Sequence, residues 1–222
     1  MLKRIVFSAV LFFTICDPLW ALPECDNSIH WKDWDNCKGK MTQTNGEIYV
    51  GDWKNGKKHG DGIFNFSNGS KYSGKFKVGK AHGKGEMKYA NGGEYVGDFK
   101  YGLREGVGTM VWHHGGKYQG EWLNDFVHGE GIATWPDGRK YVGEYVEQKK
   151  EGKGTFTWPD GDKYSGSWLN NKFHGFGTYT HSQGHVFVGN FLAGKKHGKG
   201  TYTYNDGRIE KGIWEYDKLK AE

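Results

Sequence analysis

The sequence predicts an all-β protein, an elongated single-layer twisted antiparallel sheet built from tandem 23-residue β-hairpins. Three observations predict this fold: a motif that recurs without insertion or deletion, side chains that alternate with a period of two, and an excess of glycine and aromatic residues. The 222 residues include 37 Gly and are 16% aromatic, whereas glycine at its usual frequency of ~7% would number about 15. So much glycine with so few aliphatic residues indicates a thin structure in which rings pack over bare backbone.

The repeated motif begins with an aromatic residue that is followed two positions later by Gly. It recurs seven times at intervals of 23 residues, with lead rings at Tyr49, Tyr72, Tyr95, Tyr118, Tyr141, Tyr164 and Phe187. A second ring follows each lead ring after four residues, at Trp53, Phe76, Phe99, Trp122, Tyr145, Trp168 and Phe191. Two more glycines follow 11 and 13 residues after the lead ring, and an eighth unit stops at Trp214. The array therefore covers residues 45–214.

Each unit has the pattern of a β-hairpin. In residues 72–76 ring, Gly and ring share one face while polar side chains take the other, which is strand alternation. Residues 154–158 show the same alternation and are predicted to be a return strand. Turns such as Pro136-Asp137-Gly138 are predicted to be tight, and a longer loop, such as residues 55–60, is expected at the opposite edge. The lead rings are expected to cover glycines of the neighbouring strand.

These motifs resemble a known family. Tyr141-Val-Gly-Glu-Tyr145, with His128-Gly-Glu-Gly131 and Pro136-Asp-Gly138, is similar to the MORN repeat, and the resemblance covers residues 45–214. The chain departs from the pattern at Phe187 and where Glu105 and Glu151 replace the His before Gly-x-Gly. The resemblance implies an extended sheet that serves as a binding platform without intrinsic catalysis. It also implies partners among proteins, acidic phospholipids or a second copy of the chain.

The first 21 residues have the layout of a secretory signal peptide. Lys3 and Arg4 precede an apolar run over residues 5–15, and Ala21 ends a cleavage site. The run is shorter than the ~20 residues that span a bilayer. We therefore expect a secreted or periplasmic protein; an uncleaved anchor, or lipidation at Cys16, is the alternative. Residues 22–44 are expected to form an N-terminal cap with a degenerate repeat, and residues 215–222 a tail.

Removal of the signal peptide leaves two of the three cysteines, Cys25 and Cys37. In an oxidising compartment this pair is expected to form one disulfide, with two free thiols as the alternative. The loop would contain about a dozen residues, and its closure would contribute on the order of 3 kcal/mol.

The sequence offers no convincing catalytic, cofactor or metal site. His59, His82, His128, His174 and His197 occupy one repeat position, but equivalent residues of adjacent hairpins are ~9–10 Å apart, too far to share a metal whose donors lie about 2 Å away. A hydrogen bond within the loop is the expected role of these residues. The repeated Gly-x-Gly is not followed by a helix, so it is not a nucleotide fingerprint.

Two surfaces are candidates for binding. The first is a basic edge near the turns, comprising Lys57, Lys58, Lys80, Arg104, Lys149, Lys150, Lys172, Lys195 and Lys196. The second is an aromatic face, comprising Tyr72, Phe76, Tyr95, Phe99, Tyr118, Trp122, Tyr141, Tyr145, Tyr164 and Trp168. One sheet cannot bury both its faces, and an open aromatic patch marks a contact site. The alternative is that these rings only cover their neighbours' glycines.

The sequence thus predicts an exported, non-catalytic scaffold that docks a partner protein or peptide on its aromatic face. The alternative is that the basic edge and exposed rings bind anionic phospholipid or cell-envelope glycan, which would associate the protein with a membrane. Nucleic acid is not expected as a partner, because the net charge of +5 is mild and acidic residues mix with the lysines. The terminal strands offer edges through which two copies could pair as a homodimer.

Overall fold

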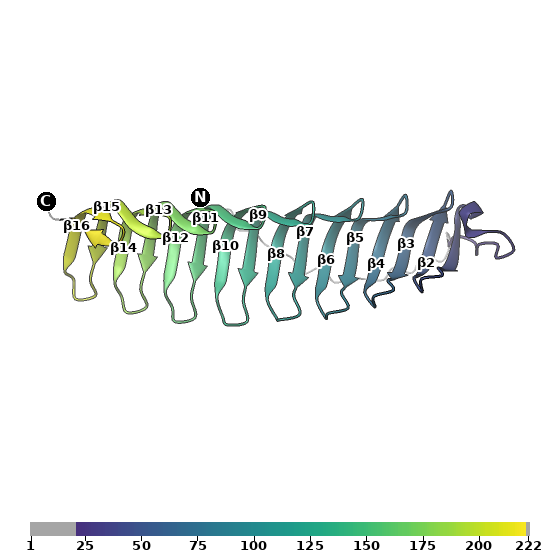
Figure 1. Cartoon of the computed structure of the whole chain (residues 1–222), viewed down its shortest axis with the longest axis horizontal. Coiled ribbons are helices and arrows are strands. Elements are labelled where there is room, and N and C mark those ends of the chain that lie inside the picture. Colours follow the sequence, from purple (N-terminus) through teal and green to yellow (C-terminus); the bar gives the residue numbers. More distant parts are fainter. Residues whose placement is uncertain (1–20, 221–222) are drawn as a thin grey trace.

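A computed structural model describes residues 21–220, so the predicted signal peptide lies outside the described residues apart from Ala21. Within them the chain forms one 17-stranded sheet and a single 3₁₀ turn, η1, at Trp31–Asp33. Figure 1 shows one elongated row of hairpins.

The seven-residue strands are β2 Ile48–Lys54, β4 Lys71–Lys77, β6 Glu94–Lys100, β8 Lys117–Leu123, β10 Lys140–Val146, β12 Lys163–Leu169, β14 Val186–Leu192 and β16 Ile209–Glu215. The nine-residue strands are β3 Lys57–Asn65, β5 Lys80–Lys88, β7 Leu103–Val111, β9 Phe126–Thr134, β11 Lys149–Thr157, β13 Lys172–Thr180 and β15 Lys195–Thr203. The sheet begins at β1 Cys37–Thr42 and ends at β17 Lys218–Leu219.

Every strand pairs antiparallel with the next one in sequence, from β1 to β17. The register repeats as the sequence does: Gly51 lies opposite Gly62 and Gly62 opposite Gly74, and the later units repeat this row of facing glycines. The predicted single-layer sheet of tandem hairpins is confirmed. Each unit therefore contacts only its neighbours, as in other repeat proteins.

One of the two kinds of turn differs from the prediction in its length. The predicted longer loop is a two-residue turn: Asn55 and Gly56 have φ of 48° and 63°, as a type I′ turn requires, and the lysines after it already belong to β3. At the opposite edge Trp135 N donates to Arg139 O and Gly138 N donates to Trp135 O. Gly138 has φ of 91°, so this loop has three residues, a turn that ends in a left-handed glycine. The prediction of a longer loop was wrong because Gly60 bends a strand and does not end a loop.

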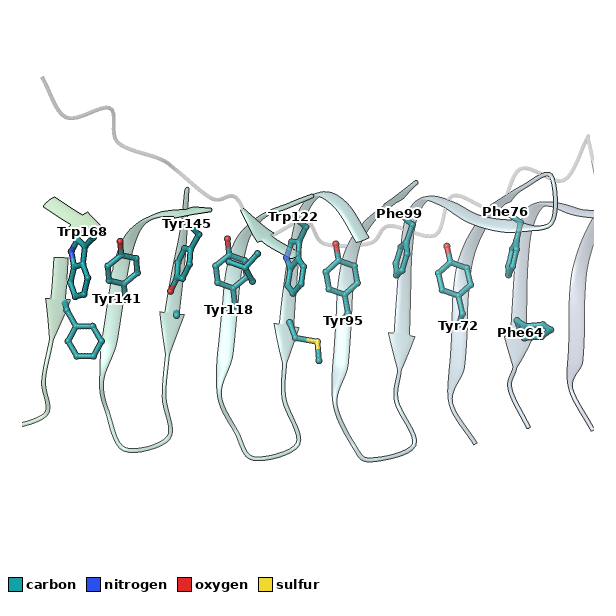
Figure 2. Close-up of a cluster of buried hydrophobic side chains, with 14 of the residues drawn as sticks. Phe64, Tyr72, Phe76, Tyr95, Phe99, Tyr118, Trp122, Tyr141, Tyr145 and Trp168 are labelled. Carbon is teal, nitrogen blue, oxygen red and sulfur yellow. The ribbon is translucent and has the colours of Figure 1, made fainter. Parts of the chain in front are cut away.

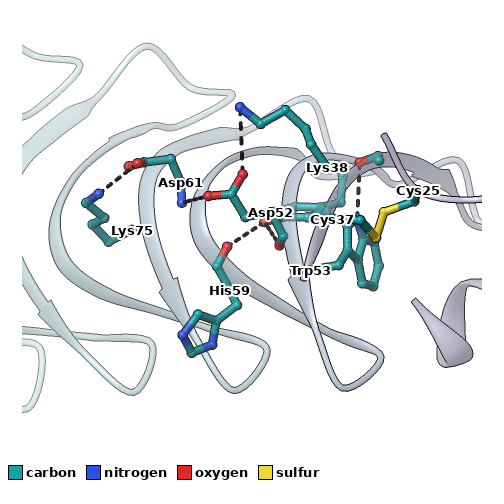
Figure 3. Close-up of polar contacts among 10 residues, drawn as sticks. Cys25, Cys37, Lys38, Asp52, Trp53, His59, Asp61 and Lys75 are labelled. Atoms are coloured by element: carbon teal, nitrogen blue, oxygen red, sulfur yellow. Dashed lines mark hydrogen bonds and ion pairs between the residues drawn. A yellow bond between two sulfur atoms is a disulfide. The ribbon is translucent and has the colours of Figure 1, made fainter. Parts of the chain in front are cut away.

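The extra length of the long strands is taken up by a bulge. Between β2 and β3 the register moves from Gly51–Gly62 to Asp52–His59, so Gly60 and Asp61 are additional, and Gly60 has φ of 55°. Asp52 Oδ2 accepts a hydrogen bond of 2.9 Å from the Asp61 amide, and Glu144 does the same for Lys153 in a later unit. Bulges of this kind bend and twist a strand. The strands consequently arch at this edge, as the N-terminal hairpins in Figure 3 show.

The core is a row of rings that lies inside this arch. The seven lead rings are at most 1% exposed, and the second rings of the seven units at most 7%. Each lead ring lies over a glycine of the next strand: a Cβ at Gly177 would be 2.5 Å from Tyr164 Oη. The predicted packing of rings on neighbouring glycines is confirmed. Figure 2 shows the rings as one line that runs across successive strands.

Residues 22–44 close the N-terminal end of this core. Gly39 of β1 lies opposite Gly51 and Gly39 O accepts from Trp53 Nε1 at 3.1 Å, as in a regular unit. Trp34 packs edge-on against Trp53 with ring centroids 5.2 Å apart. The predicted disulfide between Cys25 and Cys37 is present, with Cα atoms 4.9 Å apart (Figure 3).

The two outer edges of the sheet are covered unequally. At β1, Cys25 N donates to Lys38 O and Lys38 N donates to Pro23 O, so a preceding segment occupies part of the edge. At the other end, residues 218–219, which were expected in a tail, pair with only the last two residues of β16. Ile209 of β16 is 65% exposed. A homodimer through the terminal strands stays a prediction, for which β16 offers the more open edge.

Candidate binding groove

The predicted aromatic face is not a surface. All ten of its rings are at most 7% exposed, and five of them are at most 1% exposed: Tyr72, Tyr95, Tyr118, Tyr141 and Tyr164. The expectation that they form an open contact patch was wrong, because the bulges arch the strands over them. The alternative is correct for the lead rings, which cover the glycines of the neighbouring strand.

The buried rings form a continuous edge-to-face ladder. Tyr95 stands at 88° to Phe99 of its own strand and at 82° to Trp122 of the next unit, with centroids 5.1 and 5.3 Å apart. The same alternation continues through the later units to Trp214. This geometry is favourable for aromatic pairs. Tyr95 Oη also donates to Asp98 O at 3.0 Å, and burial raises the pKa of this phenol well above its usual value. These rings are structural.

A second row of rings lines the open side of the arch. These groove rings stand where each long strand enters its three-residue turn and are all partly buried. They are Phe66, Tyr89, Trp112, Trp135, Trp158, His181 and Tyr204. These residues were not among the predicted binding residues, although they recur at 23-residue intervals immediately before the turns. That periodicity at a turn was the signal that could have identified them.

The groove between these rings and the opposite turns contains several hollows. One hollow of about 270 Å³ is lined by Trp112, Trp135, Val127 and Tyr145, and by Gln148 of a type I′ turn on the other side. Another of about 280 Å³ is lined by Tyr89, Trp112 and Arg104. A third, also about 270 Å³, lies between His181, Tyr202 and Lys196. The hollows are shallow and follow one another along the sheet, which suits an elongated ligand.

The nine residues of the predicted basic edge divide into two sets. Five are exposed where they follow the turns: Lys57, Lys80, Lys149, Lys172 and Lys195. The other four turn inward over the rings and are partly buried; we call them the groove cations, and they are Lys58, Arg104, Lys150 and Lys196. Because side chains alternate along a strand, each pair of adjacent lysines has one member on either side of the sheet.

The groove cations contact aromatic faces. Lys58 Nζ lies 3.7 Å from the centroid of Phe64, and Arg104 Cζ lies 4.3 Å from that of Trp122. Lys196 Nζ lies 4.7 Å from Trp214. Such cation–π contacts are favourable, more so when water is excluded. Burial nonetheless lowers the pKa of the Lys58, Lys150 and Lys196 ammonium groups.

The histidine row has no metal-binding geometry. Within residues 21–220 no three His, Cys, Asp or Glu side chains converge as ligands of one ion. Glu151 accepts a hydrogen bond of 2.9 Å from Asn170 N, which belongs to the turn of the next hairpin and not to its own loop. In His82, His128 and His197 the Nδ1 atom is buried without a partner among the described residues, and the ring of His82 packs 5.1 Å from that of Tyr101. These three histidines do not make the expected loop hydrogen bond at Nδ1.

The outer face of the sheet is polar with isolated apolar side chains. Val96 and Val142 are 43% and 42% exposed, whereas Ser73 and Ser165 occupy the equivalent positions of the intervening units. Lys84 forms an ion pair of 2.7 Å with Asp98 on this face. In the described part of the chain, no helix has the length and apolar character needed to cross a membrane.

Comparison with known proteins gives a family and distant structural likenesses. No curated protein matches the chain. Among solved structures, the TCP10 domain of Danio rerio CPAP is 14% identical, with a TM-score of 0.45 over 78% of this chain and 82% of that one. The SAS-4 (dCPAP) TCP domain of Drosophila melanogaster, solved with a proline-rich motif of Ana2, is also 14% identical, with a TM-score of 0.39 over 78% and 88%.

The family model of the MORN repeat matches seven consecutive segments: 49–71, 72–94, 95–117, 118–138, 141–163, 164–186 and 187–207. These segments contain the hairpins, the facing glycines and the ladder of rings described above. MORN repeats serve as binding and scaffold modules. The chain belongs to the MORN-repeat family.

Proposed function

We propose that this chain is an exported, non-catalytic binding protein that docks a segment of a partner protein in the groove. The groove rings carry this proposal, because they form a regular row of partly exposed aromatic side chains, one in each unit, along the open side of the arch. Trp and Tyr are the residues that dominate binding energy at protein interfaces. The ten buried rings hold the groove in shape, and two of them, Tyr118 and Tyr145, form part of the floor of the hollow between Trp112 and Trp135.

The shape of the groove favours an extended peptide over a globular partner. Its hollows are shallow and repeat along the sheet, so a chain segment that runs across several units would contact a similar surface in each. The disulfide between Cys25 and Cys37 supports the exported location, because such bonds persist in oxidising compartments.

An unbiased selection tests the docking function. We would pass a random peptide display library over the immobilised chain, and then compare capture by a Trp135→Ser/Trp158→Ser variant and by a Val96→Ser/Val142→Ser control. Serine already occupies the control position at Ser73 and Ser165. The proposal predicts that selected peptides lose at least about tenfold in affinity with the tryptophan variant and bind the control as they bind the parent. Peptides that depend on the valines and not on the tryptophans would refute it.

The second candidate is binding of anionic lipid or glycan by the five exposed lysines. All five lie at the same edge of the sheet. Where consecutive units each carry such a lysine, the two lysines are ~10 Å apart. Flotation with vesicles containing anionic phospholipid, across a salt series, tests this role. Salt-sensitive flotation that is lost when Lys149 and Lys195 are replaced by Gln, while Trp135→Ser/Trp158→Ser leaves it intact, would favour the lysines over the groove.

A further inference from the structure

The charge of the side chains in the groove repeats every two units, which is every 46 residues. The second residue of each nine-residue strand points into the groove, and cationic and apolar residues alternate at this position. The series is Lys58, Ala81, Arg104, Val127, Lys150, Phe173 and Lys196. The outer face alternates in step, with Val50, Val96, Val142 and Val188 in the units that carry a groove cation. A cation therefore recurs in the groove every four strands.

Three of the groove cations form no ion pair with any described residue. Glu47 lies near Lys58, and Asp217 and Glu210 lie near Lys196, but none of these carboxylates reaches the ammonium group. Among residues 21–220, no carboxylate lies within ion-pair distance of the ammonium groups of Lys58, Lys150 and Lys196. Arg104 differs, because its Nε donates to Asp125 Oδ1 at 2.9 Å. Lys150 Nζ lies 5.3 to 5.6 Å from the centroids of four rings, those of Trp135, Tyr141, Phe156 and Trp168. A partly desolvated cation without a counter-ion is unfavourable, and an incoming carboxylate would remove that cost.

The spacing of the groove indicates the conformation of the ligand. Adjacent strands are ~4.8 Å apart, so groove rings recur every ~9.6 Å and groove cations every ~19 Å. A polyproline II helix rises ~3.1 Å per residue with three residues per turn, so it presents the same face every ~9.3 Å. Three of its residues match one unit and six match the interval between cations. From Arg104 to Lys196 the accumulated mismatch is about 1 Å, which flexible side chains can absorb.

The other regular conformations do not match the ring interval of ~9.6 Å, although six residues of a β-strand would span the ~19 Å between cations. A β-strand presents one face every ~6.7 Å, and an α-helix completes a turn every ~5.4 Å. Neither places equivalent side chains at intervals of ~9.6 Å without drifting out of register within two or three units. Aromatic grooves that hold prolyl rings also profit from the low conformational entropy of the preformed helix.

We propose that the groove binds a proline-rich segment in the polyproline II conformation that carries an acidic side chain at every sixth residue. Prolyl rings would pack between the groove rings, and successive carboxylates would lie at consecutive groove cations, pairing with Lys58, Lys150 and Lys196, which form no ion pair with the described residues, and sharing Arg104 with Asp125. This proposal rests on the proposed docking function and names the chemical class of its ligand.

Four synthetic peptides test the proposal by calorimetric titration of the full chain. The first contains three copies of Pro-Pro-Glu-Pro-Pro-Pro. The second has the same composition with its glutamates at every fourth residue, the third has Gln in place of Glu, and the fourth keeps the glutamates but has Gly and Ser in place of Pro. The first peptide is expected to bind at least about tenfold more tightly than each of the others, which is 1.4 kcal/mol or more.

Adjacent lysines provide a matched pair of variants. Lys150→Met is expected to remove most of the preference for the first peptide over the Gln peptide, whereas Lys149→Met, at the exposed neighbouring position, is expected to preserve it. Equal binding of the first two peptides, equal effects of the two variants, or no peptide binding at millimolar concentration would each overturn the proposal. Binding of a polysaccharide in place of every peptide would overturn it as well. If the display library selects groove-dependent peptides that lack proline, docking stands and this ligand class is wrong.

Discussion

The ring of Tyr164 occupies the space that a side chain at Gly177 would need. A Cβ at Gly177 would lie 2.5 Å from Tyr164 Oη, and the two residues belong to the neighbouring strands β12 and β13. Equivalent contacts recur in the other units. The lead rings and the facing glycines are therefore one structural feature, because each lead ring requires a bare position beside it.

We expect Gly177→Ala to destabilise its unit by about 2 kcal/mol or more, because the ring or the strand must move to admit the methyl group. Gly93→Ala is the control, since its Cβ would meet no atom closer than 3.3 Å and neither glycine needs a left-handed backbone. Urea unfolding followed by tryptophan fluorescence measures both. Equal destabilisation by the two substitutions would contradict the packing of Tyr164 on Gly177.

Tyr118→Phe is expected to cost about 1 kcal/mol, the usual net contribution of one hydrogen bond. Tyr118 Oη donates to Glu121 O at 3.0 Å, and the ring itself would stay in place, as Phe187 does in the seventh unit. Tyr118→Ala should cost ~3–5 kcal/mol because it also leaves a cavity. Thermal unfolding of the parent and the two variants ranks their stabilities. A similar loss of stability in Tyr118→Phe and Tyr118→Ala would contradict a packing role for the ring.

We expect that substitutions in the turn at Glu147-Gln148 can increase the stability of the protein. Both residues have positive φ, 45° and 69°, which costs a residue with a side chain roughly 1 kcal/mol relative to Gly or Asn. Glu147→Asn/Gln148→Gly should therefore raise the free energy of unfolding by about 1 kcal/mol. Asn55 and Gly56 already have this sequence and provide the internal comparison. A loss of stability in chemical denaturation would show that the native side chains make contributions larger than the strain.

Lys150→Met is expected to stabilise the chain at neutral pH by about 0.5 kcal/mol or more, because it removes a buried charge from beside the rings. Burial lowers the pKa of Lys150 in the folded protein below its usual 10.5. The unfolded chain therefore binds more protons than the folded one between the two pKa values, and the stability of the parent rises with pH in that window. The advantage of the variant should shrink as the pH approaches 10.5.

Denaturation at pH 7 and at pH 10 measures this difference, with Lys149→Met as the exposed control. An advantage that grows with pH would contradict the burial of a charged Lys150.

Cys25→Ser/Cys37→Ser should cost about 3 kcal/mol, concentrated at the N-terminal end. Trp34 would lose its support against Trp53, since the disulfide holds the segment that carries it. Hydrogen exchange should show faster exchange in β1 and β2 and little change beyond β4, because each unit contacts only its neighbours. Uniform acceleration along the whole sheet would contradict that independence.

Much of the fold follows from the period of 23 residues. The strands, the facing glycines and the rings over them could be predicted because each is written as a residue type at a fixed spacing. The arch could not be predicted, because it depends on a bulge at Gly60 with φ of 55°, and a glycine pattern does not distinguish a bulge from a loop. That single ambiguity led to the wrong length for one turn and the wrong exposure for the ten rings.

The site was only partly within reach of the sequence. The basic residues were found, but Lys149 and Lys150 received one role although the strand places them on opposite sides. The groove rings were missed because the alternation of side chains places Trp135 and Trp168 on the same face of a flat sheet, where both would be equally exposed. Only the curvature makes Trp168 core and leaves Trp135 accessible.

The most direct test of the account is to map a groove-dependent peptide onto the indole signals by NMR. The chain has tryptophans in both rows, so Trp112, Trp135 and Trp158 report on the groove and Trp122 and Trp168 on the core. On titration we expect the indole N–H signals of the three groove tryptophans to shift most, with smaller changes for the two core tryptophans and none at the outer-face amides of Val96 and Val142. Shifts concentrated at those valine amides, with the groove indoles unmoved, would contradict the claim that the groove is the docking surface.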